Sequence, residues 1–210
     1  MPTAVWIAQA LFAGWVAFWI WYGGNGQPMA LAERDALLSA LQATDTSAQG
    51  EASLAEVREL MASDDGKEFV MQNLVRYRPK ALYPAGYHYS DDPRAADKRY
   101  AKAIWWNLLR YGNLILMVAP RSGNFVVPEG ADAWHYVALV RYRSRKDFLR
   151  FAIASNKADT FVHKWAAIEK THIFPVRPIV SLFMVRSLVA LALFCAWLLL
   201  ARVLAAGSMA

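Results

Sequence analysis

A repeated pentapeptide constrains the fold of this chain more than any other feature of its sequence. Residues 74–78, Leu-Val-Arg-Tyr-Arg, recur as residues 139–143. Both copies end an apolar run, and each is followed by a turn and a helix-like segment. Two strand–turn–helix units of one kind predict a β-α-β-β-α-β domain over residues 63–178, which is the order of an α+β, ferredoxin-like fold.

Turn and capping signals divide this central domain into elements. Asp92 and Pro93 predict a helix start, and Gly112 predicts its end. The capping box Ser144–Asp147 opens a later helix, which is interrupted at residues 156–157 and continues as a second short one. Alternation of apolar residues predicts strands at 68–76, at 114–119 with an extension at 125–127, at 134–141 and at 172–176.

The order of the elements predicts their arrangement. Right-handed crossovers place the first and third strands next to each other, and we expect them to run parallel at the sheet centre. The helices then cover one face only. The other face needs a partner, usually the same face of a second subunit.

Both ends of the chain are long and apolar. Residues 4–22 carry no charge and one polar side chain outside the aromatic residues, Gln9. As a helix they extend about 28 Å, close to the hydrocarbon thickness of a bilayer. A cleaved signal peptide is the alternative, but a basic start and a small-residue cleavage site are missing. We therefore predict a transmembrane helix at 4–22.

A second transmembrane helix is predicted at 179–206, where Arg186 and Arg202 flank an apolar core. Small residues four apart, which allow close helix packing in lipid, occur in both segments. The positive-inside rule places the domain on the cytoplasmic side of a bacterial inner membrane. Between membrane and domain, residues 23–62 are predicted to form a linker with two short amphipathic helices. The helix-packing candidates are Ala10, Gly14, Ala192 and Ala196.

Charge and motif content exclude several kinds of function. The formal net charge is +6, without the basic block or motif of a nucleic-acid-binding protein. That charge favours an anionic lipid surface or an acidic partner, or is simply a solvated basic surface. The histidines lack metal-ligand spacing with carboxylates, and no nucleotide- or cofactor-binding motif is present, so neither metal nor cofactor is predicted.

Three segments of the central domain, residues 64–77, 134–145 and 163–169, resemble a domain family of unknown function. That family has the dimeric α/β-barrel fold, as do EthD-like proteins and antibiotic-biosynthesis monooxygenases. The resemblance covers about half of the chain. It implies a domain that dimerises through its open sheet face, without a settled reaction. The two membrane segments depart from the soluble pattern of the family, so a membrane neighbour is the alternative cover for that face.

One sheet face is a candidate ligand site. With the expected strand register, Phe69, Met71, Asn73, Trp134 and Tyr136 converge on this face and form an aromatic wall with a few polar groups. Small apolar ligands bind in cavities of this kind. The alternative is that the same residues pack at a dimer interface.

Three charged or titratable residues are further candidates. His163 falls at the histidine position of the resembled family and titrates near neutrality, so it is the candidate catalytic acid or base. A surface histidine is the alternative. Arg76 and Arg141 lie at equivalent strand ends and either grip an anionic ligand or pair with carboxylates at the sheet rim.

Two functions of different classes follow from these observations. The first is a membrane-anchored accessory subunit, whose domain caps or bridges membrane partners in a larger complex. The second is a membrane-tethered small-molecule-binding protein or enzyme that uses the aromatic cavity, with His163 as its base. The expected partners are the lipid bilayer and either other membrane subunits or a second copy of the chain.

Overall fold

The computed structural model describes residues 2–22, 26–44, 50–180, 191–192, 194–199 and 201–202. Residues 24–177 make up one compact unit, which contains the predicted central domain. The chain before and after it belongs to a second unit.

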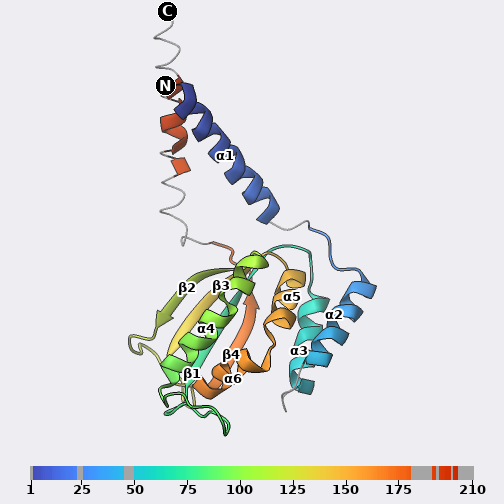
Figure 1. The fold of residues 1–210 in the computed structure, drawn as a ribbon, viewed down its shortest axis with the longest axis vertical. Coiled ribbons are helices and arrows are strands. Elements are labelled where there is room, and N and C mark those ends of the chain that lie inside the picture. Colours follow the sequence, from blue (N-terminus) through green and yellow to red (C-terminus); the bar gives the residue numbers. More distant parts are fainter. Residues whose placement is uncertain are drawn as a thin grey trace, which may run out of the picture. The chain divides into compact units, whose positions relative to one another are not determined.

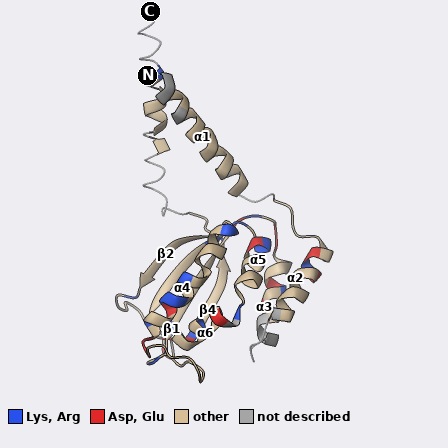
Figure 2. Ribbon diagram, viewed as in Figure 1, with Lys and Arg blue, Asp and Glu red and all other residues tan. Residues whose placement is uncertain are grey.

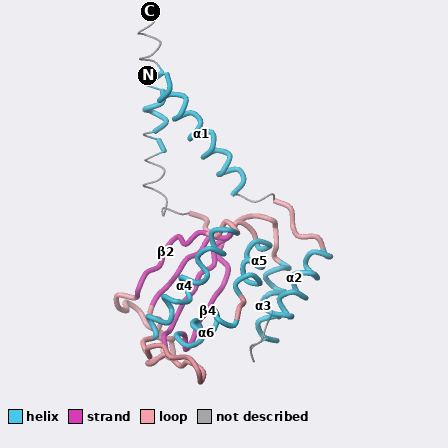
Figure 3. Tube along the Cα trace, viewed as in Figure 1, coloured by secondary structure: helices cyan, strands magenta, loops and turns pink. Residues whose placement is uncertain are grey.

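A four-stranded antiparallel sheet is the centre of the larger unit (Figures 1 and 3). Its strand order is β2-β3-β1-β4, so the first and third strands are neighbours, as predicted. The two longer strands are β1 (Phe69–Tyr77) and β4 (Ile168–Val176). The other two are β2 (Leu114–Pro120) and β3 (Tyr136–Tyr142).

The predicted parallel pairing of the first and third strands is wrong. β1 and β3 run antiparallel, with Val70 opposite Arg141 and Val75 opposite Tyr136. The crossover through the first helix makes β1 parallel to β2, which is not its neighbour. The β2–β3 hairpin then reverses the chain, so β3 lies between the two and runs against both. The extension predicted at 125–127 is also wrong, because these residues lie in the exposed loop between β2 and β3.

Three helices cover one face of this sheet (Figure 1). α4 (Pro93–Arg110) begins where predicted, because the Asp92 side chain accepts a hydrogen bond from the Arg94 backbone N–H at 2.9 Å. α5 (Arg145–Ser155) begins at the predicted cap, where the Ser144 hydroxyl accepts from the Asp147 N–H at 3.1 Å. α6 (Ala158–Ala167) follows after a two-residue break and leads directly into β4.

Apolar residues from the sheet and these helices form the main core. Ile104 and Leu108 of α4 and Phe151 of α5 are buried against Phe69 and Met71 of β1. Two further helices, α2 (Leu31–Thr44) and α3 (Gly50–Ala62), occupy the predicted linker. They contribute to a second cluster in which Met29, Met61 and Leu149 are buried, so they extend the core beyond α5.

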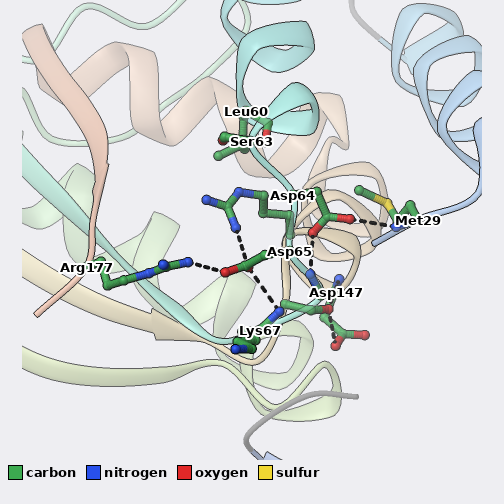
Figure 4. A network of polar contacts seen from close by, with 11 residues as sticks. Met29, Leu60, Ser63, Asp64, Asp65, Lys67, Asp147 and Arg177 are labelled. Atoms are coloured by element: carbon green, nitrogen blue, oxygen red, sulfur yellow. Dashed lines mark hydrogen bonds and ion pairs between the residues drawn. The ribbon is translucent and has the colours of Figure 1, made fainter. Parts of the chain in front are cut away.

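A polar junction joins the segment before α2 to the start of β1 (Figure 4). The Asp64 carboxylate accepts from the Met29 N–H at 2.7 Å and from the Gly66 N–H at 3.1 Å. Asp65 pairs with Arg145 at 3.1 Å and with Arg177, beyond the end of β4. Gly66 has a φ of +67°, and a Cβ there would lie 2.2 Å from the Gln27 carbonyl oxygen. The turn therefore requires glycine for both conformation and space.

The smaller unit contains α1 (Pro2–Tyr22), which carries no charged residue (Figure 2). Within the described part of the chain, no helix combines the length and the apolar character needed to cross a bilayer. The predicted pair of spans at 4–22 and 179–206 is therefore wrong, as is the predicted integral membrane localisation. Of the second predicted span, residues 181–190, 193, 200 and 203–206 lie outside the described residues. With its amide rotated, the Gln9 carbonyl accepts from Arg202 Nε at 2.8 Å, so a guanidinium lies against α1.

The predicted helix-packing residues lie on exposed surface. Ala10 and Gly14 are exposed on α1, and a Cβ at Gly14 would meet no described atom within 4 Å. Ala192 and Ala196 are exposed as well. Their role in helix packing stays a prediction.

Candidate functional site: a chamber between the sheet and its helices

A chamber of about 700 Å³ lies between the sheet and the helices that cover it. This volume is in the range of pockets that bind small molecules. Alternate residues of each strand face inward, which brings Met71, Asn73, Ala138, Val140, Ile115 and Ile173 to its floor. Helix residues three to four apart form its roof, among them Tyr100, Ile104, Leu108, Phe151 and Phe161.

The chamber opens to solvent between β2 and α4. Ile115 and Val118 of β2 line it yet are 42% and 57% exposed, so the inner face of this strand is not fully covered. Ala101 of α4 also lines the chamber and is exposed. A ligand can therefore enter at this edge without separation of the helices from the sheet.

A carboxylate and two tyrosine hydroxyls form the polar end of the chamber. The Tyr77 hydroxyl at the end of β1 donates to Asp97 Oδ2 of α4 at 2.8 Å. Tyr136, the first residue of β3, also hydrogen-bonds to Asp97. The Tyr77 and Tyr136 rings are adjacent, with centroids 5.5 Å apart. All three side chains line the chamber.

Burial governs the protonation of this group. It raises the pKa of Asp97, although the hydrogen bonds from Tyr77 and Tyr136 and the positive charge of Lys164 act in the opposite direction. Burial, together with the nearby Asp97 charge, also raises the pKa of both tyrosines well above the ordinary value. The tyrosines therefore remain protonated at neutral pH and serve as hydrogen-bond donors.

Lys164 of α6 brings a cationic side chain to the chamber. It lines the chamber, and its Nζ lies 5.8 Å from the ring centroid of Tyr100 and 5.3 Å from that of Phe161. Burial lowers the pKa of Lys164 to about 8, and the Asp97 carboxylate offsets only part of this shift. A substantial fraction of this amine is thus neutral just above physiological pH.

The predicted cavity residues divide into two groups. Met71, Asn73 and Tyr136 line the chamber. Phe69 is buried in the core instead, where it stacks on Tyr142 with ring centroids 5.5 Å apart. Trp134 precedes β3 and is not among the lining residues. The face that these residues share lies under the helices, rather than at the open face where a dimer partner was expected.

Arg76 and Arg141 do not act together. Because β1 and β3 are antiparallel, the two arginines lie at opposite ends of the sheet, on its outer face. Arg76 pairs with Asp132 at 3.4 Å and with Glu169 at 3.1 Å, and Arg141 pairs with Glu68. Their guanidinium groups therefore make the rim ion pairs that were the alternative to an anion site.

His163 lies outside the chamber. Its Nδ1 is 2.9 Å from the Tyr83 hydroxyl, and its ring meets Tyr89 edge-on, with centroids 5.0 Å apart. Burial and the neighbouring Arg99 charge lower the pKa of His163, while Asp159 acts to raise it. His163, on α6, thus packs against an aromatic cluster on the loop before α4. Its catalytic role stays a prediction.

Sequence reasoning missed Asp97 and Lys164. Both keep helical spacing with apolar residues that line the chamber: Asp97 is three residues before Tyr100, and Lys164 is three residues after Phe161. A charged residue on the buried stripe of an amphipathic helix was the available signal, since such residues are rarely buried without a reason.

Comparison with known proteins supports the fold. No protein-family model matches the chain, and no curated protein does. Two crystal structures of the RPA0582 protein, one described as a protein of unknown function from Rhodopseudomonas palustris, are similar at a TM-score of 0.53 each. They are 23% and 22% identical to this chain, cover 65% and 66% of it, and are themselves covered to 95% and 98%.

The fold is ferredoxin-like. The four-stranded antiparallel sheet with its order β2-β3-β1-β4 and one helical layer has this topology. A dabb family protein with a ferredoxin-like fold from Mesorhizobium loti matches at a TM-score of 0.33 and 9% identity. The match covers 54% of this chain and 98% of the chain of that protein. The predicted combination of such a domain with two flanking transmembrane helices is contradicted, because no described helix is able to span a bilayer.

Proposed function

We propose that this protein binds a small, largely apolar molecule in the chamber between the sheet and helices α4–α6. The observation that carries the proposal is a cavity of about 700 Å³ with an apolar wall and one polar end. A well-packed core contains few voids larger than a water molecule, so a space of this size is not a packing defect.

The polar end defines how the molecule is oriented. Tyr77 and Tyr136 both hydrogen-bond to Asp97, and Lys164 lies on the neighbouring helix. These groups include donors and an acceptor, and a ligand hydroxyl or carbonyl group satisfies them in the absence of water. The apolar remainder of the ligand then contacts Ile104 and Ala138.

That the outer face of the sheet binds a second copy of the chain or another partner stays a prediction. Leu74, Val137, Leu139 and Phe174 lie on this face and are partly buried. A homodimer through this face, and an accessory role in a larger assembly, stay predictions. The membrane anchor that was expected to accompany that role is not among them.

Ligand binding is testable with a matched pair of substitutions on α4. Ala101 lines the chamber at its mouth, and Ala103, two residues later, is exposed and does not line it. Ala101→Trp should therefore close the mouth, whereas Ala103→Trp adds the same ring to the surface. We expect native mass spectrometry with cinnamyl alcohol and related apolar alcohols to show one molecule per chain, and Ala101→Trp to weaken binding at least about tenfold.

The same experiment contradicts the proposal in two ways. Equal loss of binding in both variants would show that the ligands adhere to the surface of α4. Saturable binding that neither variant changes would place the site elsewhere. Thermal unfolding of both variants controls for structural damage, since an exposed alanine on a helix tolerates substitution with little change in stability.

A further inference from the structure

We propose that the bound molecule carries an aldehyde or ketone group, and that Lys164 forms an imine with its carbonyl carbon. The inference rests on the proposed ligand chamber and adds the chemical class of the ligand. It also makes Lys164 the nucleophile of the proposed binding cavity.

The placement of Lys164 is unusual for a lysine. The residue lies on α6 in a layer of helices that faces the sheet, and it lines the chamber. Its ammonium group faces the Trp165 ring at 4.8 Å as well as the rings of Tyr100 and Phe161. Among the described residues no carboxylate oxygen lies within ion-pair distance of Nζ. A lysine in these surroundings is desolvated, as nucleophilic lysines are.

The electrostatic surroundings favour the neutral amine at mild pH. The titratable and charged groups that line the chamber with Lys164 are Arg94, Asp97 and Tyr100 of α4, Tyr77 of β1, His135 just before β3, and Tyr136 and Tyr142 of β3. The tyrosines are uncharged, so Asp97 alone opposes the loss of the proton. With its pKa lowered to about 8, a much larger share of this amine is neutral near physiological pH than for an ordinary lysine.

The proposed step balances without an external reactant. The nitrogen lone pair of neutral Lys164 attacks the carbonyl carbon, a C–N bond forms, and the carbonyl π electrons move to oxygen, which takes a proton. The resulting carbinolamine loses its hydroxyl group with a further proton as water, and a C=N bond remains. Overall, one ammonium and one carbonyl give one protonated imine and one water. Asp97, held by Tyr77 and Tyr136, is placed to transfer these protons and to face the cationic product.

Reductive trapping tests the step directly. The full chain is incubated with cinnamaldehyde and sodium cyanoborohydride, which reduces the imine to a stable secondary amine, and the modified lysine is located by peptide mapping. We expect modification at Lys164 at least about tenfold faster than at Lys102, an exposed lysine on α4 that does not line the chamber. The rate at Lys164 should level off above a pH of about 8.

Two controls separate this proposal from ligand binding alone. Cinnamyl alcohol has the same apolar body without the carbonyl and should slow trapping at Lys164 by competition. Lys164→Arg keeps the positive charge but removes the nucleophilic amine, so it should abolish trapping at position 164. Because peptide mapping of the unaltered protein already gives the answer, the test does not depend on the folding of this variant.

The outcomes are distinguishable. Saturable alcohol binding in the chamber, with aldehyde modification spread evenly over the exposed lysines, overturns the imine and leaves the binding function intact. Even modification together with no alcohol binding overturns both. Selective modification of Lys164 that the alcohol slows supports both.

Discussion

At the residue scale, one half-buried carboxylate connects two walls of the chamber. Asp97 comes from α4, and the hydroxyls that bind it come from β1 and β3. Burial of a charge is unfavourable unless hydrogen bonds compensate for it, and here two donors offset part of that cost. The same contacts therefore orient the polar end of the site and fix the helix against the sheet.

Asp97 should make the stability of the protein depend on pH in a specific direction. Its pKa is higher in the folded protein than in the unfolded chain, so the folded state binds more protons. The free energy of unfolding then falls as pH rises from about 4 through the raised pKa. We expect the stability of the natural protein, minus that of Asp97→Asn, to decrease over this range in urea titrations.

Asp91→Asn is the matched control for that measurement. Asp91 lies on the loop before α4 in an exposed ion pair with Lys80, at 3.2 Å. Exposed pairs contribute little to stability, so this variant should follow the natural protein closely. The opposite result would be a stability of the natural protein, minus that of Asp97→Asn, that increases with pH. It would mean that the folded protein favours the charged carboxylate, which contradicts the raised pKa.

The residues that sequence reasoning identified and missed differ in a physical way. Met71, Asn73 and Tyr136 were found because strand alternation assigns side chains to one face directly. Asp97 and Lys164 were missed because a charged residue on a helix is normally counted as solvent-exposed. Only the packing of α4 and α6 shows that these two line the same space.

At the element scale, local signals determined where the helices start. The Asp92 and Ser144 caps act through hydrogen bonds to residues two or three positions away, so their effect does not depend on the rest of the fold. Strand direction is a non-local property. The repeated pentapeptides both lie in strands, yet β1 and β3 run in opposite directions, and Leu74 faces Val137 rather than its counterpart in the repeat.

The turn before β1 gives a prediction for the junction with the N-terminal segment. Gly66→Ala would place a methyl group 2.2 Å from the Gln27 carbonyl oxygen at a φ of +67°. Gly130→Ala has a similar φ of +74° but open space around it, and so isolates the conformational cost of about 1–2 kcal/mol. We expect Gly66→Ala to lose about 1–3 kcal/mol more than Gly130→Ala in chemical denaturation, owing to the overlap.

Equal losses for the two glycine variants would contradict this description of the junction. That result would show that residues 26–29 are not held against the turn, and that the Asp64 contacts with Met29 contribute little. A selective loss in Gly66→Ala would show that α2 and α3 depend on the turn for their attachment to the rest of the unit.

At the scale of the whole molecule, the sequence was informative about the central domain and misleading about the ends. Sixty-odd residues separate the two copies of the repeat, which left room for one helix and one hairpin and so restricted the topology. For residues 4–22 the absence of charge outweighed the polar groups of Gln9 and the tryptophans. Length and charge alone did not distinguish a spanning helix from α1, which does not combine the length and the apolar character that a span needs.

The chamber itself is a property of the whole larger unit, because all four strands and three helices line it. The strand pattern predicted which residues face inward, but not the distance between the layers. Bulky helix side chains such as Tyr100 and Phe151 line the chamber and pack in the main core as well. A packed core and an open chamber therefore have the same sequence pattern.

Methyl NMR of the full chain during titration with cinnamyl alcohol tests the central claim most directly. Ile104, Ile115, Ala138 and Ile173 line the chamber, whereas Met117, Val137 and Leu139 lie on the outer face of the same sheet. The account predicts saturable shift changes in the first group and little change in the second. Changes confined to the outer face, or absent from both groups at saturating alcohol, would show that the chamber is not a ligand site.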